Sequence, residues 1–360
     1  MKAAVCYEFG KPLVIEEIDI LPPQKGEVKV RIAAAAICHS DVHLIRGEWG
    51  GRTPVVAGHE AAGIVEEIGE NVTIATPSEH VVVSLLRSCG RCFYCTTGSP
   101  YMCEGEFALD TESRLRTKRG EPIRHGSRTA AFAEYVIVEQ SQVVPVPHEI
   151  PLDQAALLAC GVITGVGAVL NTATVELGSS VVVIGVGGVG LNAIQGAVLA
   201  GAYPIIAVDL LDKKLAAAKT FGATDTIHVA QMKYPERVVR ELTAGRGADY
   251  VFVTVGSTTA VDMGFKMIGR QGTEVIVGIP QTGSKVSFPV SHFVGGERKV
   301  MGSSMGSSRL SVDVPRLVEL YKRRRIKLDE LITARYPIEQ INEAIEIMEK
   351  GEALRNVIIF

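Results

Sequence analysis

The sequence lacks any large excess of one charge. Its 360 residues carry 37 Lys and Arg against 40 Asp and Glu, which gives a formal net charge of -3. A chain with this balance has no general attraction for a polyanion, so we predict that it has no nucleic-acid partner. The one basic run, YKRRR at 321–325, follows an apolar pattern and is typical of a solvated helix end.

The sequence also lacks a signal-like start and an unbroken apolar stretch. The first residues, MKAAVCYEFGKPL, do not show the charged-then-apolar pattern of a secretory signal. The most apolar segment, residues 181–208, is interrupted by Asn192, Gln195 and several glycines. We therefore expect a cytoplasmic protein that makes no use of a membrane.

What the sequence does contain is seven cysteines, four of them between residues 89 and 103. The stretch CGRCFYCTTGSPYMC places Cys89, Cys92, Cys95 and Cys103 in the spacing C-x2-C-x2-C-x7-C. Disulfides rarely persist in a reducing cytosol, and four such close thiolates suit a tetrahedral cage. Zinc bound by four sulfurs would be structural, because no ligand position stays open. An iron–sulfur cluster, which also takes four thiolates, is the alternative.

The pattern of apolar residues predicts an α/β protein of two domains. Residues 1–150 show short alternating runs separated by Gly and Pro, which indicate a β-rich domain. A helix is predicted over 153–173, with a break at Gly161, and then strands alternate with helices at 188–200, 212–221, 235–244 and 258–269. This alternation is typical of a doubly wound parallel sheet. Two further helices and a final strand, NVIIF, follow residue 297.

A glycine-rich turn predicts a dinucleotide site. In VVVIGVGGVG, Gly185, Gly187 and Gly190 form the pattern G-x-G-x-x-G directly after an apolar strand, and Asp209 follows at the end of the next strand. Such glycines let the backbone approach a pyrophosphate at a helix N-terminus. The Asp209 carboxylate can accept hydrogen bonds from ribose hydroxyls and would repel a 2′-phosphate, so the pattern favours NAD over NADP.

Several motifs in order along the chain resemble the zinc-dependent medium-chain alcohol dehydrogenases. They are ICHSD, GHEAAGIVEEIG, the four-cysteine stretch, CGVITGVGA, VVVIGVGGVG and the tail YPIEQINEAIEIMEKGEALRNVI. The resemblance is nearest to the class with a cysteine as third zinc ligand, which includes formaldehyde-type and nicotinoprotein-type bacterial enzymes. It implies a chaperonin-10-like catalytic domain built from both chain ends, 1–155 and 297–360, with a Rossmann coenzyme domain, 156–296, inserted between them.

The resemblance also implies the roles of individual residues. Cys38, His59 and Cys160 would bind a catalytic zinc, Asp41 would orient His59, Glu60 would lie behind the metal, and Ser40 and His43 would relay a proton. The coenzyme would contact residues on both sides of the glycine-rich turn: His39, Thr164, Gly188, Val189, Lys214 and Arg355, beside the glycines and Asp209. The expected cofactors are two zinc ions per chain and NAD.

The expected substrates are small alcohols and aldehydes, and the expected assembly is a homodimer or homotetramer. The arginine with which glutathione-dependent formaldehyde dehydrogenases hold a glutathione carboxylate has no clear counterpart here, whereas Trp49 and Leu85 fall near positions that line the substrate pocket. Three alternatives stay open at this point. The chain could hold NAD tightly and cycle alcohol against aldehyde, could oxidise a thiol adduct, or could be an inactive relative that only binds ligands.

Overall fold

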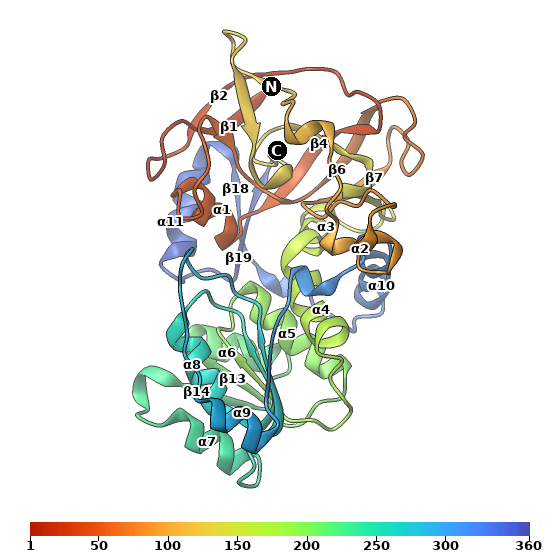
Figure 1. Ribbon diagram of the computed structural model, residues 1–360. Coiled ribbons are helices and arrows are strands. Elements are labelled where there is room, and N and C mark those ends of the chain that lie inside the picture. Colours follow the sequence, from red (N-terminus) through yellow and green to blue (C-terminus); the bar gives the residue numbers. More distant parts are fainter. The chain divides into compact units, whose positions relative to one another are not determined.

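The computed structural model describes residues 1–360, and the chain divides into two compact units. Unit 1 contains Met1–Cys160 and Arg309–Phe360, and unit 2 contains Gly161–Ser308. Unit 1 is therefore built from both ends of the chain, as Figure 1 shows by the red and blue ribbons that lie side by side in it. The predicted domain boundaries, after residues 155 and 296, lie slightly earlier than these divisions.

Unit 1 consists of β-sheets with short helices. Its strands are β1 (Lys2–Cys6), β2 (Val14–Glu17), β3 (Asp19–Ile20), β4 (Glu27–Ala36), β5 (Val55–Val56), β6 (Glu60–Ile68), β7 (His80–Ser84), β8 (Leu115–Arg116), β9 (Pro122–His125), β10 (Tyr135–Glu139), β11 (Val143–Pro145), β18 (Ile332–Pro337) and β19 (Arg355–Ile359). Its helices are α1 (His39–Ile45), α2 (Phe93–Thr96), α3 (Leu152–Leu157), α10 (Leu310–Lys322) and α11 (Ile341–Glu349).

The larger sheet of unit 1 joins the two ends of the chain. It has seven strands, in the order β11-β7-β6-β4-β19-β18 with β10 also paired to β4. The C-terminal strand β19 pairs antiparallel with β4, so that Val357 lies opposite Ala36. The alternation of apolar and polar residues in β4 turns one face of this sheet into the core.

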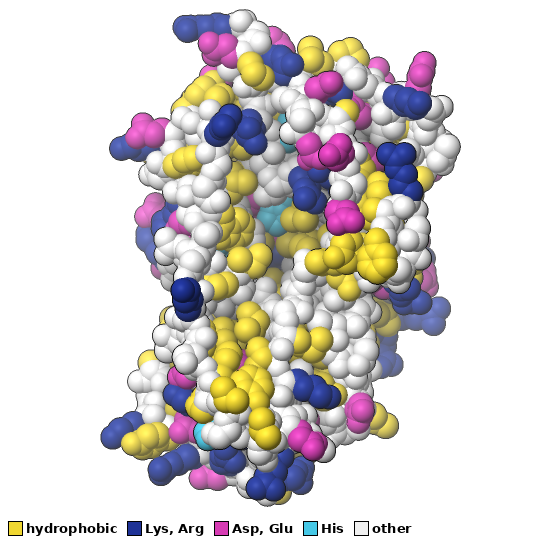
Figure 2. Space-filling model, viewed as in Figure 1, with side chains coloured by type: hydrophobic (Ala, Val, Ile, Leu, Met, Phe, Trp, Pro, Cys, Tyr) yellow, Lys and Arg dark blue, Asp and Glu magenta, His cyan; other side chains and the backbone are white.

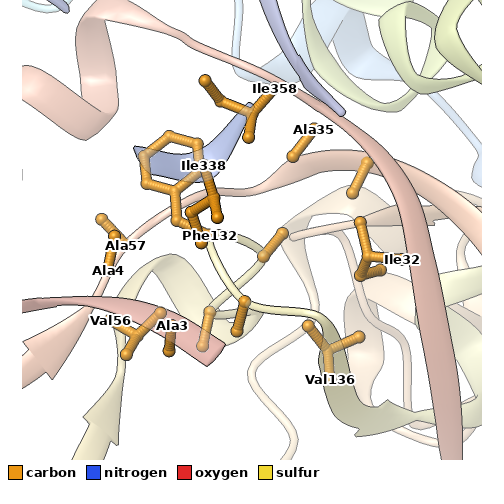
Figure 3. Close-up of a cluster of buried hydrophobic side chains, with 14 of the residues drawn as sticks. Ala3, Ala4, Ile32, Ala35, Val56, Ala57, Phe132, Val136, Ile338 and Ile358 are labelled. Carbon is orange, nitrogen blue, oxygen red and sulfur yellow. The ribbon is translucent and has the colours of Figure 1, made fainter. Parts of the chain in front are cut away.

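One buried cluster holds unit 1 together. Figure 3 shows Phe132, which is fully buried, among Ala3 and Ala4 of β1, Val56 of β5, and residues from the far end of the chain. The residues from the far end of the chain are Ile338 and Ile358. The small side chains of Ala3 and Ala4 share this cluster with the large Phe132 ring, as close packing of a protein interior requires.

Unit 2 is a parallel sheet flanked by helices. Its six strands run in the order β14-β13-β12-β15-β16-β17, and every pairing between neighbours is parallel. The strands are β12 (Val181–Ile184), β13 (Ile205–Asp209), β14 (Asp225–His228), β15 (Ala248–Val253), β16 (Ile268–Ile276) and β17 (Lys299–Gly302). The helices are α4 (Ile163–Gly167), α5 (Gly188–Leu199), α6 (Asp212–Thr220), α7 (Pro235–Leu242), α8 (Thr258–Met267) and α9 (Val290–Gly296). The α/β fold class predicted from the sequence is thus confirmed.

The helix predicted over 153–173 does not break at Gly161. The chain instead forms a π-helical turn over Leu158–Val162, between α3 and α4, and a second one over Ala168–Thr172. Such wide turns insert an extra residue without ending the helix, and they are frequent at functional sites. The whole run Leu152–Thr172 is long and apolar enough to cross a membrane, but 83% of its most apolar window is buried inside the protein. It is a core helix.

Candidate active site

The four clustered cysteines converge on one point. Their sulfur atoms all lie within 4.8 Å of one another, and none forms a disulfide. The backbone N–H groups of Cys89 and Gly105 donate to the sulfur of Cys103 over 3.2 and 3.3 Å, and the N–H of Cys92 donates to the sulfur of Cys89 over 3.4 Å. Backbone donors aimed at sulfur favour thiolates, which is the form that binds zinc.

The local backbone is shaped around these sulfurs. A Cβ atom at Gly105 would lie 2.6 Å from the Cβ and 2.8 Å from the sulfur of Cys89, so only glycine fits there. The N–H groups of Cys95 and Glu104 lower the pKa of Cys92 to about 6. The four thiolates therefore fit a tetrahedral zinc ion with no free position, which is the geometry of a structural site.

A second set of metal-binding side chains comes from three distant segments. Cys38 directly precedes α1, His59 directly precedes β6, and Cys160 lies in the π-helical turn after α3. Their ligand atoms all lie within 4.8 Å of one another, and all three residues are buried. Two sulfurs and one imidazole leave the fourth position of a tetrahedral zinc open to a substrate, so this set has the character of a catalytic site.

Asp41 fixes the orientation of His59. Nδ1 of His59 donates to Oδ1 of Asp41 over 2.8 Å, which leaves Nε2 pointing at the cluster, 3.3 Å from the sulfur of Cys160. The same carboxylate accepts the N–H of Gly58 over 3.0 Å and the N–H of Cys38 over 3.2 Å. Gly58 has a φ of +94°, and a Cβ there would lie 2.7 Å from the backbone nitrogen of Phe132. A carboxylate behind a ligand histidine sets its tautomer and raises its strength as a ligand.

The three ligand side chains shift one another's pKa values. The hydrogen bond with Cys160 lowers the pKa of Cys38 well below its usual value, and the same contact together with burial raises the pKa of Cys160. Although burial opposes a charged ring, Asp41 and Cys38 raise the pKa of His59 well above its usual value. A zinc ion would replace these protons, because it binds the thiolates and the neutral imidazole.

Glu60 and Arg355 form a buried ion pair next to this cluster. Both oxygens of the Glu60 carboxylate accept from Nη2 of Arg355, whose Nη1 donates to the carbonyl of Ile37 over 3.3 Å. Arg355 is only 4% exposed, and its Nε has no hydrogen-bond partner. Arg355 thus holds Glu60 in the interior, while the role of Glu60 behind a metal and the contact of Arg355 with a pyrophosphate stay predictions.

The remaining polar residues of this region lie on α1. His39 is exposed in its first turn, and Ser40 and His43 are partly buried. His43 contacts two residues that the sequence argument did not connect with it: Nδ1 lies 2.5 Å from Oε2 of Glu48, and its ring lies 5.0 Å from that of Trp49. The glycine at position 47, a common helix C-terminal signal, is the sequence feature that could have revealed this arrangement.

The glycine-rich turn of unit 2 has the backbone of a dinucleotide site. Gly185 has a φ of +86°, which allows the tight turn after β12. A Cβ at Gly187 would meet nothing within 4 Å, so this glycine leaves open space at the start of α5, whose first residue is Gly188. A Cβ at Gly190 would lie 2.0 Å from the carbonyl oxygen of Gly185, so here glycine allows close packing of helix on strand. These are the three roles of the glycines in a Rossmann turn.

Asp209 lies at the end of β13 beside this turn. Its Oδ2 accepts the N–H of Val186 over 2.8 Å, and its Oδ1 accepts the N–H groups of Leu210 and Leu211 over 2.8 and 3.1 Å. The carboxylate is thus held at the position from which such folds contact an adenosine ribose. Lys214 follows in the first turn of α6 and is half-buried.

Thr164 lies near Val189. A Cβ at the next residue, Gly165, would be 2.3 Å from the carbonyl oxygen of Val189, so α4 and α5 pack in contact at this point. The Thr164 hydroxyl donates to the sulfur of Met305 over 3.6 Å. Gly165, next to Thr164, thus packs on Val189, while Asp209 contacts Val186 of the glycine-rich turn; the coenzyme contacts of these residues stay predictions.

A metal-dependent dehydrogenase is the class that this fold and these two sites define. Residues 24–148 match the family profile described as alcohol dehydrogenase GroES-like domain, and residues 188–323 match the profile described as zinc-binding dehydrogenase. The chain belongs to the zinc-dependent medium-chain alcohol dehydrogenase family.

Relatives from plants and bacteria agree with this assignment. An alcohol dehydrogenase class-P from Arabidopsis thaliana is 38% identical over 99% of this chain and 96% of its own length, and an alcohol dehydrogenase class-3 from Pisum sativum is 39% identical over 99% and 97%. Among solved structures, the benzyl alcohol dehydrogenase of Acinetobacter calcoaceticus is similar with a TM-score of 0.93 and 32% identity, covering 100% of this chain and 99% of that one.

The comparisons confirm the main predictions from the sequence. The chain is an alcohol dehydrogenase with a GroES-like domain, a Rossmann-type domain, a structural four-cysteine zinc site and a catalytic zinc site made of Cys38, His59 and Cys160. The family implies NAD as coenzyme and alcohols as substrates.

Proposed function

We propose that the protein interconverts uncharged primary alcohols and their aldehydes with NAD as the hydride acceptor. The observation that carries this proposal is the buried set of Cys38, His59 and Cys160 with Asp41 behind the histidine. Zinc held by these ligands supplies a Lewis acid that polarises the substrate oxygen, and NAD supplies the carbon that receives the hydride.

The chain's own residues would bind the substrate and move its proton. The Ser40 hydroxyl, two residues after Cys38, can accept a hydrogen bond from the substrate hydroxyl and pass the proton on. His43, one helical turn further on α1, is the residue that we assign as the final acceptor, because imidazole changes its protonation state near working pH.

For the coenzyme we propose contacts on both sides of the glycine-rich turn. Asp209 would accept the ribose hydroxyls with Lys214 beside it, and Thr164 and Val189 would pack on the nicotinamide. His39 and Arg355 would meet the pyrophosphate. What supports this is the backbone of the turn and the position of the Asp209 carboxylate at its edge.

The substrate class rests on residues that match pocket-lining positions of the family. Trp49 and Leu85 offer apolar surface, and no arginine corresponds to the one that holds a glutathione carboxylate in formaldehyde-type enzymes. One similar structure is a benzyl alcohol dehydrogenase, whereas two similar plant enzymes are class-3 alcohol dehydrogenases. We place this chain with the first, and therefore propose aliphatic and aromatic primary alcohols as substrates.

A substrate panel tests this function. The purified zinc-loaded enzyme is assayed with NAD against benzyl alcohol, longer aliphatic alcohols, ethanol and S-(hydroxymethyl)glutathione. We expect kcat/KM to be highest for an uncharged alcohol with an apolar tail. Efficiency dominated by the glutathione adduct would overturn the substrate class. Activity that persists without added NAD, with coenzyme released only on denaturation, would instead identify the tightly bound NAD alternative. The Cys160→Ser variant serves as the control and should lose activity with every substrate.

We also propose that the protein is a homodimer, or a tetramer of such dimers, assembled through unit 2. Strand β17 ends the parallel sheet and has no neighbour on its outer side, and such an edge is a template for a further strand. On the adjacent α9, Val290 and Val294 are 75% and 78% exposed, and Figure 2 shows hydrophobic side chains gathered on this face. A second copy would cover the edge and both valines by two-fold pairing.

Sedimentation velocity tests the assembly. The double variant Val290→Lys, Val294→Lys should sediment as a smaller species than the wild type, because two charges would be buried in each half of the interface. The control is Leu177→Lys, since Leu177 is 85% exposed elsewhere in unit 2. A monomeric wild type, or a double variant that assembles normally, would rule out this interface.

A cytoplasmic location is proposed from the seven cysteines. None of them forms a disulfide, and six of them lie in the two sets where metal binding needs them reduced. Fractionation of cells that produce the protein, with a periplasmic or secreted marker as control, tests the location.

A further inference from the structure

The end of helix α1 brings Glu48 back onto His43 through the backbone. Gly47 has a φ of +72°, and its N–H donates to the carbonyl of Leu44 over 3.0 Å, while the N–H of Glu48 donates to the carbonyl of His43 over 3.0 Å. These two bonds form a Schellman motif, which ends a helix. In this motif the second residue after the C-cap, here Glu48, folds back against the last helical turn. The backbone alone therefore places Glu48 beside His43.

Gly47 cannot be exchanged at this turn. Its positive φ disfavours other residues, and a Cβ would lie 2.9 Å from the ring of Phe9. In addition, the N–H of Gly10 donates to the carbonyl of Ile45 over 2.9 Å, which ties the helix end to the segment that carries Phe9. The position of Glu48 relative to α1 is thus defined by packing rather than by a mobile loop.

The side chains complete a closed arrangement. Oε2 of Glu48 lies 2.5 Å from Nδ1 of His43, and the Trp49 ring covers the imidazole at 5.0 Å between centroids. The nearby Arg46 does not compete for Glu48, because it pairs with Glu349 at 2.5 Å. Glu48 and His43 are each less than one third exposed, so the contact is partly shielded from water.

We infer that Glu48 is a positioning residue for His43, which it holds with the proton on Nδ1 so that Nε2 can accept the proton of the substrate. A carboxylate that accepts from one ring nitrogen fixes the tautomer of the neutral ring. It also stabilises the imidazolium that forms when Nε2 takes up a proton, by the same charge-assisted hydrogen bond. This inference rests on the proposed role of His43 as the final acceptor. It adds that His43 and Glu48 act as a pair, in which Glu48 itself does not contact the substrate.

The tautomer of His43 can be measured directly. Protein labelled with ¹⁵N in its histidines is studied with NAD bound over a series of rising pH values, up to the point where the His43 signals no longer change. The His43 signals are assigned by their loss in His43→Gln. We expect the shifts of a ring protonated at Nδ1 in the wild type, and a change toward protonation at Nε2 in Glu48→Ala. Glu67→Ala, which removes an exposed glutamate from β6, is the matched control and should leave the signals unchanged.

Kinetics give a second readout with the same variants. Under conditions where hydride transfer limits the rate near neutral pH, Glu48→Ala should lower kcat for alcohol oxidation by about tenfold or more, which corresponds to the loss of one hydrogen bond to a charged group. The Glu48→Gln variant keeps an acceptor oxygen but not the charge. Its kcat should therefore lie between those of the wild type and Glu48→Ala. KM for the alcohol and the zinc content should stay at wild-type values, since Glu48 contacts neither substrate nor metal.

The outcomes separate this inference from the proposed function. A wild-type ring protonated at Nε2, or a tautomer that Glu48→Ala does not change, would overturn the role of Glu48. If the tautomer changes as expected but His43→Gln retains the wild-type rate, the positioning by Glu48 stands and the relay role of His43 is wrong.

Discussion

Glu274 gives unit 2 a stability that should fall as the pH rises. This residue lies near the C-terminal end of β16 and is fully buried, and neither of its carboxyl oxygens has a hydrogen-bond partner. It fits only because α8 carries a glycine opposite, where a Cβ at Gly264 would lie 2.4 Å from Oε1. Burial, and to a lesser degree Asp262, raise the pKa of Glu274 to about 8.

The folded and unfolded chains bind different numbers of protons at Glu274. The carboxyl ionises from about pH 4.5 in the unfolded chain, but only near pH 8 in the folded one, so the folded state holds more protons between these values. The free energy of unfolding therefore falls as the pH rises through this interval. The interval corresponds to at most about 5 kcal/mol, and local relaxation that admits water should reduce this to about 3 kcal/mol.

Replacement of Glu274 by glutamine removes the titration and keeps the shape. The opening free energy of the sheet is measured by hydrogen exchange on peptides from β15 and β16, in wild type and variant, from pH 5 to pH 8.5. A buried amide without partners adds a penalty that does not depend on pH, so the difference between the two proteins should change by about 3 kcal/mol across the range, in favour of the variant at high pH. Glu241→Gln on the exposed side of α7 is the control. A difference that stays constant with pH would refute the reasoning.

Three further predictions concern stability, metal and coenzyme. Burial and the nearby arginines lower the pKa of His125 to about 4, so the wild type should lose up to about 3 kcal/mol as the pH falls from about 6.5 to 4, and a urea titration of His125→Gln should show a flatter profile. Metal analysis should find about two zinc ions per chain in the wild type and one in Cys95→Ser, which should also melt earlier; iron in the wild type would refute the zinc assignment. Asp209→Gly should reduce the ratio of kcat/KM for NAD over NADP, and a wild type that already prefers NADP would contradict the placement of this carboxylate.

The local motifs could be predicted from the sequence because each occupies one short segment. The four cysteines lie within one loop, and the glycines lie within one strand–turn–helix, so spacing alone defines which atoms can meet. The catalytic trio is different. Cys38, His59 and Cys160 are joined only by the fold, and spacing could not unite them. The resemblance to a family did so, and the structure brings their ligand atoms within 4.8 Å.

Other features depend on tertiary packing, which short sequence patterns do not encode. Strand β17, which lies beyond the predicted end of the coenzyme domain at residue 296, pairs with β16 and extends the parallel sheet. With only four residues, KVMG, this strand is too short for a periodic pattern to reveal. The π-helical turn at Cys160 was predicted as a break because glycine usually weakens a helix, whereas packing on both sides of this buried segment keeps it helical.

The insertion of unit 2 between the two parts of unit 1 has a consequence for synthesis on the ribosome. Strand β4 is made early, but its neighbour β19 emerges among the last residues, after the whole of unit 2. Domains tend to fold as they leave the exit tunnel, so unit 2 can complete its sheet before β19 is available to pair with β4. A chain that is terminated shortly before Arg355 would have an intact coenzyme domain, an open edge on β4, and no Arg355 to pair with Glu60. We therefore expect chains that lack the last few residues to be recognised by cellular quality control.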